Sequence, residues 1–228
     1  MVINDRHRFI FVHIPKTAGT SMMAALEALP GNNRRWLATT KHETLAEFHA
    51  NWPRRRSWWD RLRSRSPAAY RTFAFVRNPW ERMSSLFRYL KEARPREEIG
   101  TVGSFADFVT QAADGVDWFR NLHSMRPQTE FFKLNGDAGP PTLRLDYLGH
   151  FEHLAEDVAD VARRLGIRID LGHKNESTNR KRDYRADYTD RMFEIVGELF
   201  GADAGPFGYV PDQRLPAKRC SGPIDQPC

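Results

Sequence analysis

Two stretches of the sequence combine the residue types that bind anions. The first is PKTAGTS at residues 15–21, which contains Lys16, Gly19 and several hydroxyl side chains. The second is RNPWERMSS at residues 77–85, in which Ser85 follows Arg77 at about two helical turns. Cationic side chains, hydroxyls and the unpaired N–H groups of a helix start are the donors that a tetrahedral anion requires. The sequence therefore predicts two anion sites.

The first stretch differs from the phosphate loop of NTPases. In that loop, G-x-x-x-x-G-K-[ST], the lysine follows the second glycine and the next hydroxyl binds magnesium. Here Lys16 precedes Gly19, and Pro15 stands at the approach to the loop. The pattern indicates a phosphate-like ligand rather than a magnesium nucleoside triphosphate, and an ATP-dependent kinase of the P-loop type is the alternative.

The elements that must position these residues have the same order in both cases. An apolar run at 9–14 precedes the first stretch and another at 72–76 precedes the second, as expected for buried parallel strands. After each stretch, apolar residues recur at helical spacing, and Pro79 suits the first turn of a helix. Strand-loop-helix units of this kind predict an α/β fold, a three-layer sandwich with a central parallel sheet. Anion sites at the ends of two neighbouring strands suit a nucleotide that carries phosphates at both ends of its ribose.

The remaining chain predicts further elements of one domain over residues 1–228. Helices are expected at 104–113, 115–125, 151–166 and 188–203, with Gly166 ending the third of them. A strand is expected at 141–148, and a helix after residue 41 with Glu43 in its first turn. A basic excursion covers about 52–67, and a polar tail covers about 211–228.

Composition limits the classes of partner. The formal net charge is +6 and the pI is near 9.5, which favours anionic ligands. No helix-turn-helix, zinc or RNA-recognition pattern accompanies the charge, so a nucleic-acid partner is not expected. The only cysteines, Cys220 and Cys228, lie in the tail. The N-terminus is too poor in apolar residues for a signal peptide or membrane span, and we expect a cytoplasmic protein.

The two motifs together resemble a known family. FVHIPKTAGTS followed by FAFVRNPWERMSSLF is similar to the cofactor motifs of sulfotransferases that use 3′-phosphoadenosine 5′-phosphosulfate (PAPS), especially the branch of carbohydrate sulfotransferases and bacterial relatives. RPQTEFF, LDYLGHFEHLAEDV, HKNEST and YTDRMFEIVGELFGADAGPFGY extend the resemblance from Phe9 to Tyr209. It implies a P-loop NTPase-like sulfotransferase fold, PAPS as donor without a metal, and a hydroxyl acceptor on a carbohydrate or glycosylated metabolite.

The resemblance also implies roles for individual residues. Lys16 stabilises the leaving oxygen, and Arg77 with Ser85 holds the 3′-phosphate. Lys174 and Ser177, in HKNESTNRKR, contact the adenine or the 3′-phosphate, and a solvated basic loop is the alternative. The loop that binds the 5′-phosphosulfate comprises Lys16, Thr17, Ala18, Gly19, Thr20 and Ser21.

A general base is expected between the two motifs, where relatives place a catalytic histidine or glutamate. We assign it to His42, because histidine titrates near neutrality. Glu43 is the alternative base, or it only favours a helix N-terminus. His13 is interpreted as a core residue and His49 as helix surface.

The Arg- and Trp-rich stretch at 54–65 has two interpretations. A solvated excursion is one, and contact with an acidic glycan or a membrane surface is the other. A non-catalytic protein that uses the fold to bind an anionic glycan is the alternative to an enzyme.

Overall fold

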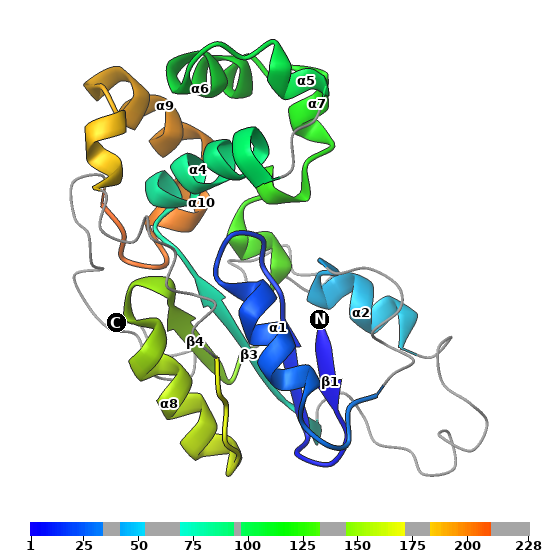
Figure 1. Cartoon of the computed structure of the whole chain (residues 1–228). Coiled ribbons are helices and arrows are strands. Elements are labelled where there is room, and N and C mark those ends of the chain that lie inside the picture. The colour runs from blue at the N-terminus through cyan, green and yellow to red at the C-terminus, as the bar shows by residue number, and fades with distance from the viewer. Residues whose placement is uncertain (34–41, 53–68, 94–96, 133–144, 172–182, 211–228) are drawn as a thin grey trace. The chain divides into compact units, whose positions relative to one another are not determined.

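The computed structural model describes residues 1–33, 42–52, 69–93, 97–132, 145–171 and 183–210 (Figure 1). The chain forms two compact units. The first contains Met1–Val76, Gln128–Asn175 and Cys220–Cys228, and the second contains Arg77–Pro127 and Glu176–Arg219. The expectation of a single domain over residues 1–228 stays a prediction.

The first unit is built on a four-stranded sheet in the order β1-β2-β3-β4. Strands β2 (Phe9–Val12), β3 (Arg71–Val76) and β4 (Tyr147–His150) are parallel, and β1 (Val2–Asn4) pairs with β2 in the antiparallel direction. The predicted mixed α/β fold with a central parallel sheet is confirmed, with the antiparallel edge strand as an addition. The carboxyl ends of β2, β3 and β4 lie at one edge of the sheet, because these strands run in the same direction.

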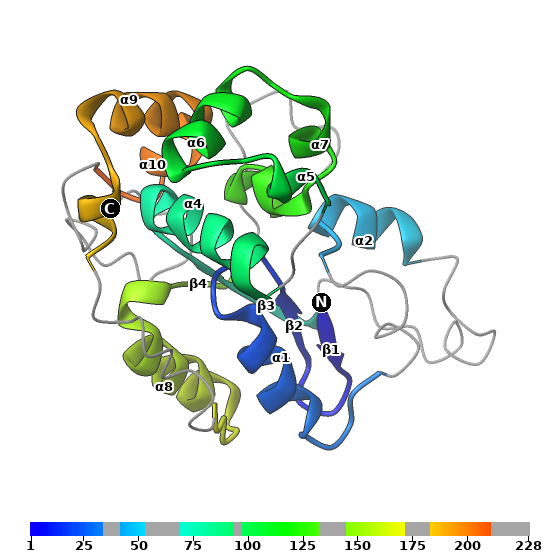
Figure 2. The same cartoon turned by 45° about the horizontal axis from the view of Figure 1, so that its top comes forward.

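Both faces of the sheet are buried, as expected for strands that read as continuous apolar runs. On one face, Phe11 and Phe73 pack against α1 (Gly19–Glu27) and α8 (Leu154–Leu165), which lie along the same side of the sheet in Figures 1 and 2. The alternate residues Ile10 and Ala74 are fully buried as well. Helix α8 ends at Gly166, whose φ of 63° is the left-handed conformation that the sequence predicted for its cap.

The described part of the first unit also contains helix α2 (Leu45–Asn51) and 3-10 turns at Gln128–Phe131 and Phe151–His153. The N-cap of α2 is Thr44, whose side chain accepts from the Glu47 N–H while the Glu47 carboxylate accepts from the Thr44 N–H. The helix therefore starts later than the sequence predicted, because this reciprocal cap fixes its first turn. Glu43 lies before the cap and not in the first turn.

The second unit is helical. Its helices are α4 (Pro79–Arg88), continued by a π-helical turn at Tyr89–Ala93, then α5 (Glu97–Gly100), α6 (Phe105–Ala113), α7 (Asp117–Arg120), α9 (Asp190–Leu199) and α10 (Gly201–Ala204). Short 3-10 turns lie at His123–Met125 and Tyr184–Asp187. Helices α4, α6 and α9 pack on one another around rings such as Phe87, Phe108 and Phe105.

Most predicted elements are present, with shifted ends. Ser104 caps α6 and Thr189 caps α9, where the sequence placed those helices. The strand predicted at 141–148 occurs in the described residues as β4, Tyr147–His150, which pairs with Phe73–Val76 of β3. Residues 141–144 lie outside the described part of the chain. In the described part of the chain, no helix has the length and apolar character needed to cross a membrane.

Candidate active site

The loop between β2 and α1 has an unusual backbone. Lys16 and Ala18 have φ angles of 70° and 62°, so two non-glycine residues adopt the left-handed region within three positions. Turns of this kind direct successive N–H groups into one concavity, which is suited to an anion. A left-handed non-glycine residue costs on the order of 1–3 kcal/mol, and such strain gathers at ligand-binding sites.

The start of α1 is suited to an anion as well. Its N-cap, Ala18, has no side chain that can accept from the first N–H groups, and the first turn contains no acidic residue. The N-terminal end of the helix dipole thus meets no carboxylate of its own helix. Helix α4 differs, because the Asn78 side chain accepts from the N–H groups of Trp80 and Glu81 and closes that helix start.

Two loop residues make structural contacts that the sequence did not reveal. Thr17 is buried, and its hydroxyl donates to the Ile14 carbonyl at 3.1 Å, which closes the turn. A Cβ on Gly19 would lie 1.8 Å from Cδ2 of His13. Gly19 is therefore required by the histidine ring packed against it. Thr20 is exposed, and Lys16, Ala18 and Ser21 are half-buried.

His42 lies next to the start of this loop. Its ring centroid is 4.5 Å from that of His13, and its Nδ1 lies 3.3 Å from the His13 carbonyl oxygen. A carbonyl oxygen only accepts, so Nδ1 carries the proton, and in the neutral ring Nε2 keeps its lone pair. His13 itself is buried, as predicted for a core histidine, and it supports His42 through both its ring and its carbonyl.

The two alternatives to His42 lie in different surroundings. Glu43 is 4% exposed, and its carboxylate accepts from the side-chain amide of Asn51 at 3.0 Å. That contact ties the carboxylate to the last turn of α2. His49 is exposed on α2, as predicted.

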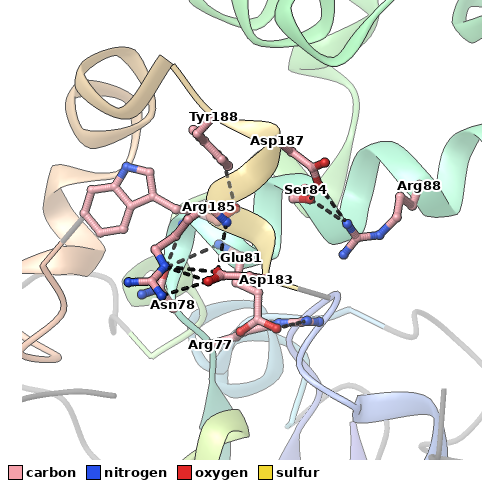
Figure 3. A network of polar contacts seen from close by, with 10 residues as sticks. Arg77, Asn78, Glu81, Ser84, Arg88, Asp183, Arg185, Asp187 and Tyr188 are labelled. Atoms are coloured by element: carbon pink, nitrogen blue, oxygen red, sulfur yellow. Dashed lines mark hydrogen bonds and ion pairs between the residues drawn. The ribbon is translucent and has the colours of Figure 1, made fainter. Parts of the chain in front are cut away.

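In the second unit, Arg77 is the residue that follows the end of β3 in the chain. Its guanidinium is largely buried and forms an ion pair with Glu81, with Nη2 and Oε1 at 2.8 Å. Glu81 is in the first turn of α4, whose start is fixed by Asn78 and Pro79. The cap and the ion pair together hold Arg77 beside the first turn of the helix (Figure 3).

The two serines of RNPWERMSS differ in burial. Ser84 is buried, donates to the Asp187 carboxylate at 3.2 Å and accepts from Arg88 at 2.8 Å. Arg88 also pairs with Asp187 at 3.3 Å (Figure 3). Ser85, the predicted phosphate ligand, is half-buried. The sequence did not indicate which serine was structural, because Ser84 and Ser85 are adjacent residues of the same type.

Arg82 was not identified from the sequence as a buried residue. It is 2% exposed, and its Nη2 donates to the carbonyls of Ser124 and Arg126 at 2.8 and 2.9 Å. Asp203 lies 3.8 Å away, and the Phe200 ring lies under the guanidinium. Burial lowers the pKa of Arg82 to about 10, so the side chain stays charged at neutral pH. Its spacing of four residues from Leu86, which lies on the buried face of α4, was the available signal.

A segment before α9 docks on α4. The Tyr188 hydroxyl donates to the Trp80 carbonyl at 2.8 Å, and Arg185 pairs with Asp183 at 2.7 Å (Figure 3). Burial, with the charge of Glu81 as a smaller cause, raises the pKa of Tyr184 to about 12. Burial likewise raises the pKa of Tyr188 well above its ordinary value.

Two groups of predicted residues lie outside the described part of the chain. They are Lys174 and Ser177 in the late loop, and the Arg- and Trp-rich stretch at 54–65. Their roles stay predictions.

A cavity of about 270 Å³ lies in the first unit, away from the loop between β2 and α1. It opens at the amino ends of β3 and β4, whereas the loop follows the carboxyl end of β2. Its polar groups already have partners, since Asp146 accepts from the Thr72 N–H at 2.6 Å and Arg71 donates to the Arg164 carbonyl. The remaining lining residues are Phe73, Tyr147, Val161 and Leu165.

Comparison with known proteins agrees with the two motifs. The model of the sulfotransferase family matches residues 1–210. The chain belongs to the sulfotransferase family. A similar curated protein is carbohydrate sulfotransferase 12 of Mus musculus, which is 24% identical over an alignment of 263 residues. The alignment covers 94% of this sulfotransferase-family chain and 61% of the relative, so the chain spans about three fifths of that relative's length. No solved structure matches the chain significantly.

Proposed function

We propose that this protein transfers a sulfuryl group from PAPS to a hydroxyl of a carbohydrate or a glycosylated metabolite. Membership of the sulfotransferase family supports the type of reaction. The name of the mouse relative supports a carbohydrate acceptor. The backbone of residues 16–18 and the uncapped start of α1 fit a tetrahedral anion, which supports a donor of this kind.

The observation that carries the proposal is the placement of His42 beside the phosphate loop. Its Nδ1 contact with the His13 carbonyl leaves Nε2 as the basic nitrogen. A hydroxyl nucleophile gains on the order of 10²- to 10⁴-fold in rate from a base within hydrogen-bond reach. We assign this role to His42 rather than Glu43, because Glu43 is buried and bound to Asn51.

The other roles follow from charge. The donor supplies the sulfuryl group, and the loop 16–21 binds its 5′ end through backbone N–H groups, hydroxyls and the Lys16 ammonium. Lys16 neutralises the charge that grows on the leaving phosphate oxygen. Arg77, a planar guanidinium suited to phosphate, binds the 3′-phosphate together with Ser85.

Calorimetric titration tests the donor assignment. We expect the protein to bind adenosine 3′,5′-bisphosphate more tightly than ADP with magnesium, and Lys16→Ala and Arg77→Ala each to weaken the bisphosphate. Tight binding of ADP with magnesium alone would indicate a kinase. Unchanged bisphosphate affinity in both variants would show that the site assignment is wrong.

The acceptor can be identified by mass spectrometry. Candidate glycans, glycolipids and glycosylated small molecules are incubated with PAPS and the protein, and a sulfate-sized mass gain marks the acceptor. A matched reaction without PAPS is the control. Bisphosphate binding with no mass gain on any hydroxyl compound would favour a non-catalytic glycan-binding protein.

A further inference from the structure

The charge of Arg77 already has a carboxylate partner before any ligand binds. Arg77 pairs with Glu81 at 2.8 Å, and Arg185 pairs with Asp183 at 2.7 Å in the segment docked on the same helix. Figure 3 shows these groups around the start of α4. Among these four side chains the formal charges sum to zero. An incoming phosphate at Arg77 therefore meets the Glu81 carboxylate as well as the guanidinium.

The Glu81 carboxylate is the group that competes most directly. It is a planar anion bound to the guanidinium that the proposed function assigns to the 3′-phosphate, and carboxylate and phosphate satisfy arginine in the same way. The Arg77 and Glu81 side chains are 10% and 25% exposed, so water screens the pair less than it screens a surface pair.

The capping of α4 makes Glu81 available for this contact. A glutamate three residues after an N-cap usually accepts from the N-cap N–H. In α4 the Asn78 side chain accepts from the N–H groups of Trp80 and Glu81, and the Glu81 carboxylate accepts from Arg77. Because Arg77 precedes the N-cap, the ion pair crosses the start of the helix.

We propose that Glu81 is an internal competitor for Arg77, which weakens the binding of the 3′-phosphate and thereby speeds release of the bisphosphate product. As the nucleotide leaves, Glu81 pairs with Arg77 again. This inference rests on the proposed function, and it adds a residue that tunes affinity at one end of the nucleotide.

Glu81→Gln removes the competing charge and keeps the shape of the side chain. We expect the dissociation constant for adenosine 3′,5′-bisphosphate to fall about three- to tenfold, mostly through slower dissociation. Adenosine 5′-monophosphate, which lacks the 3′-phosphate, should bind wild type and variant alike. Calorimetry gives the affinities, and stopped-flow displacement gives the dissociation rates.

The matched control is Glu194→Gln in the same unit. Glu194 pairs with Arg191 at 2.9 Å on α9, and both side chains are well exposed, so this change removes one negative charge without touching Arg77. It should leave both affinities unchanged. Glu81→Asp keeps the charge and shortens the side chain, and should tighten the bisphosphate less than Glu81→Gln. It provides the test if Glu81→Gln fails to fold.

The outcomes separate this inference from the proposed function. If the wild type does not prefer the bisphosphate over adenosine 5′-monophosphate, the proposed function fails, and this inference fails with it. If the wild type shows that preference but the Glu81 variants bind the bisphosphate equally or more weakly, Glu81 only orients Arg77 and this inference alone is wrong. An equal gain for both nucleotides also overturns it.

Discussion

At the scale of single residues, the loop after β2 combines a strained backbone with close side-chain packing. Lys16 and Ala18 adopt the left-handed backbone conformation although neither is glycine. At Gly19 a side chain is excluded, because the His13 ring occupies the space. The sequence PKTAGTS thus uses its glycine for packing and its strained residues for the turn. The same His13 places its carbonyl against His42, so the packed core and the candidate base are coupled.

His42→Gln tests the candidate base. We expect turnover to fall on the order of 10²- to 10⁴-fold, because the amide nitrogen and oxygen of glutamine are far weaker bases than the Nε2 lone pair. The affinity for adenosine 3′,5′-bisphosphate should stay within about twofold of the wild type. A coupled sulfotransfer assay and calorimetry measure the two quantities.

His49→Gln is the matched control, since His49 lies exposed on the neighbouring helix α2. It should leave turnover unchanged. If His42→Gln retains full turnover, the proton goes elsewhere and Glu43 becomes the residue to test.

At the scale of elements, the start of α4 and its buried face make different contacts. Its start holds Arg77 and Glu81, while Arg82 and Met83 point into the second unit. Arg82 ties the segment around Ser124 to the helix, because one guanidinium nitrogen satisfies two carbonyls. Arginine suits this role through its planar fork of donors.

Arg82→Ala should destabilise the protein by about 3–5 kcal/mol, because it leaves Asp203 and two carbonyls buried without their cation. Arg191→Ala, which breaks an exposed pair with Glu194, should cost only about 0–1 kcal/mol. Urea unfolding followed by circular dichroism measures both. A similar loss in the two variants would show that burial of Arg82 contributes nothing beyond a surface pair.

At the scale of the whole molecule, the two units differ in what they contribute. The first provides the sheet, the loop between β2 and α1, and His42. The second provides Arg77, Ser85 and the docked segment that ends at Tyr188. Neutral tyrosines hold this docked segment, since the Tyr188 hydroxyl donates to the Trp80 carbonyl and a phenolate has no proton to donate. Protonation of these tyrosines is therefore linked to stability.

Stability should fall as the pH rises from about 10 toward 12. The folded-state pKa of Tyr184 is raised to about 12 from the unfolded value of 10.0, so its contribution is complete below 10 and is lost as the pH passes through the folded value. Tyr184 contributes at most about 2–3 kcal/mol to the free energy of unfolding, at about 1.4 kcal/mol per unit of pKa difference. Urea unfolding across this pH range measures the loss.

Tyr184→Phe separates this contribution from the titration of lysines, which is common to both proteins. The variant should show a shallower fall in unfolding free energy above pH 10, and its phenolate absorbance should lose a late-titrating group. Parallel curves for the two proteins would contradict the link between Tyr184 and alkaline unfolding.

The sequence by itself determined the three parallel strands, the main helices and the family, because apolar periodicity, helix ends and two motifs act over a few residues. The apolar run at 9–14, the helix at 104–113 and the C-terminal Gly166 could be identified directly. PKTAGTS and RNPWERMSS were recognisable because anion binding needs particular residue types at close spacing.

Only the tertiary structure decided which of these residues are held by contacts with distant side chains. The His13 ring packs against Gly19, Ser84 donates to Asp187, and Glu43 accepts from Asn51. Sequence spacing alone did not reveal these contacts. Arg82 looks like a surface charge in the sequence and lies in the core, because its partners come from segments more than forty residues away. Local patterns encode elements, but burial and pairing depend on how distant segments meet, which the sequence specifies only through the complete fold.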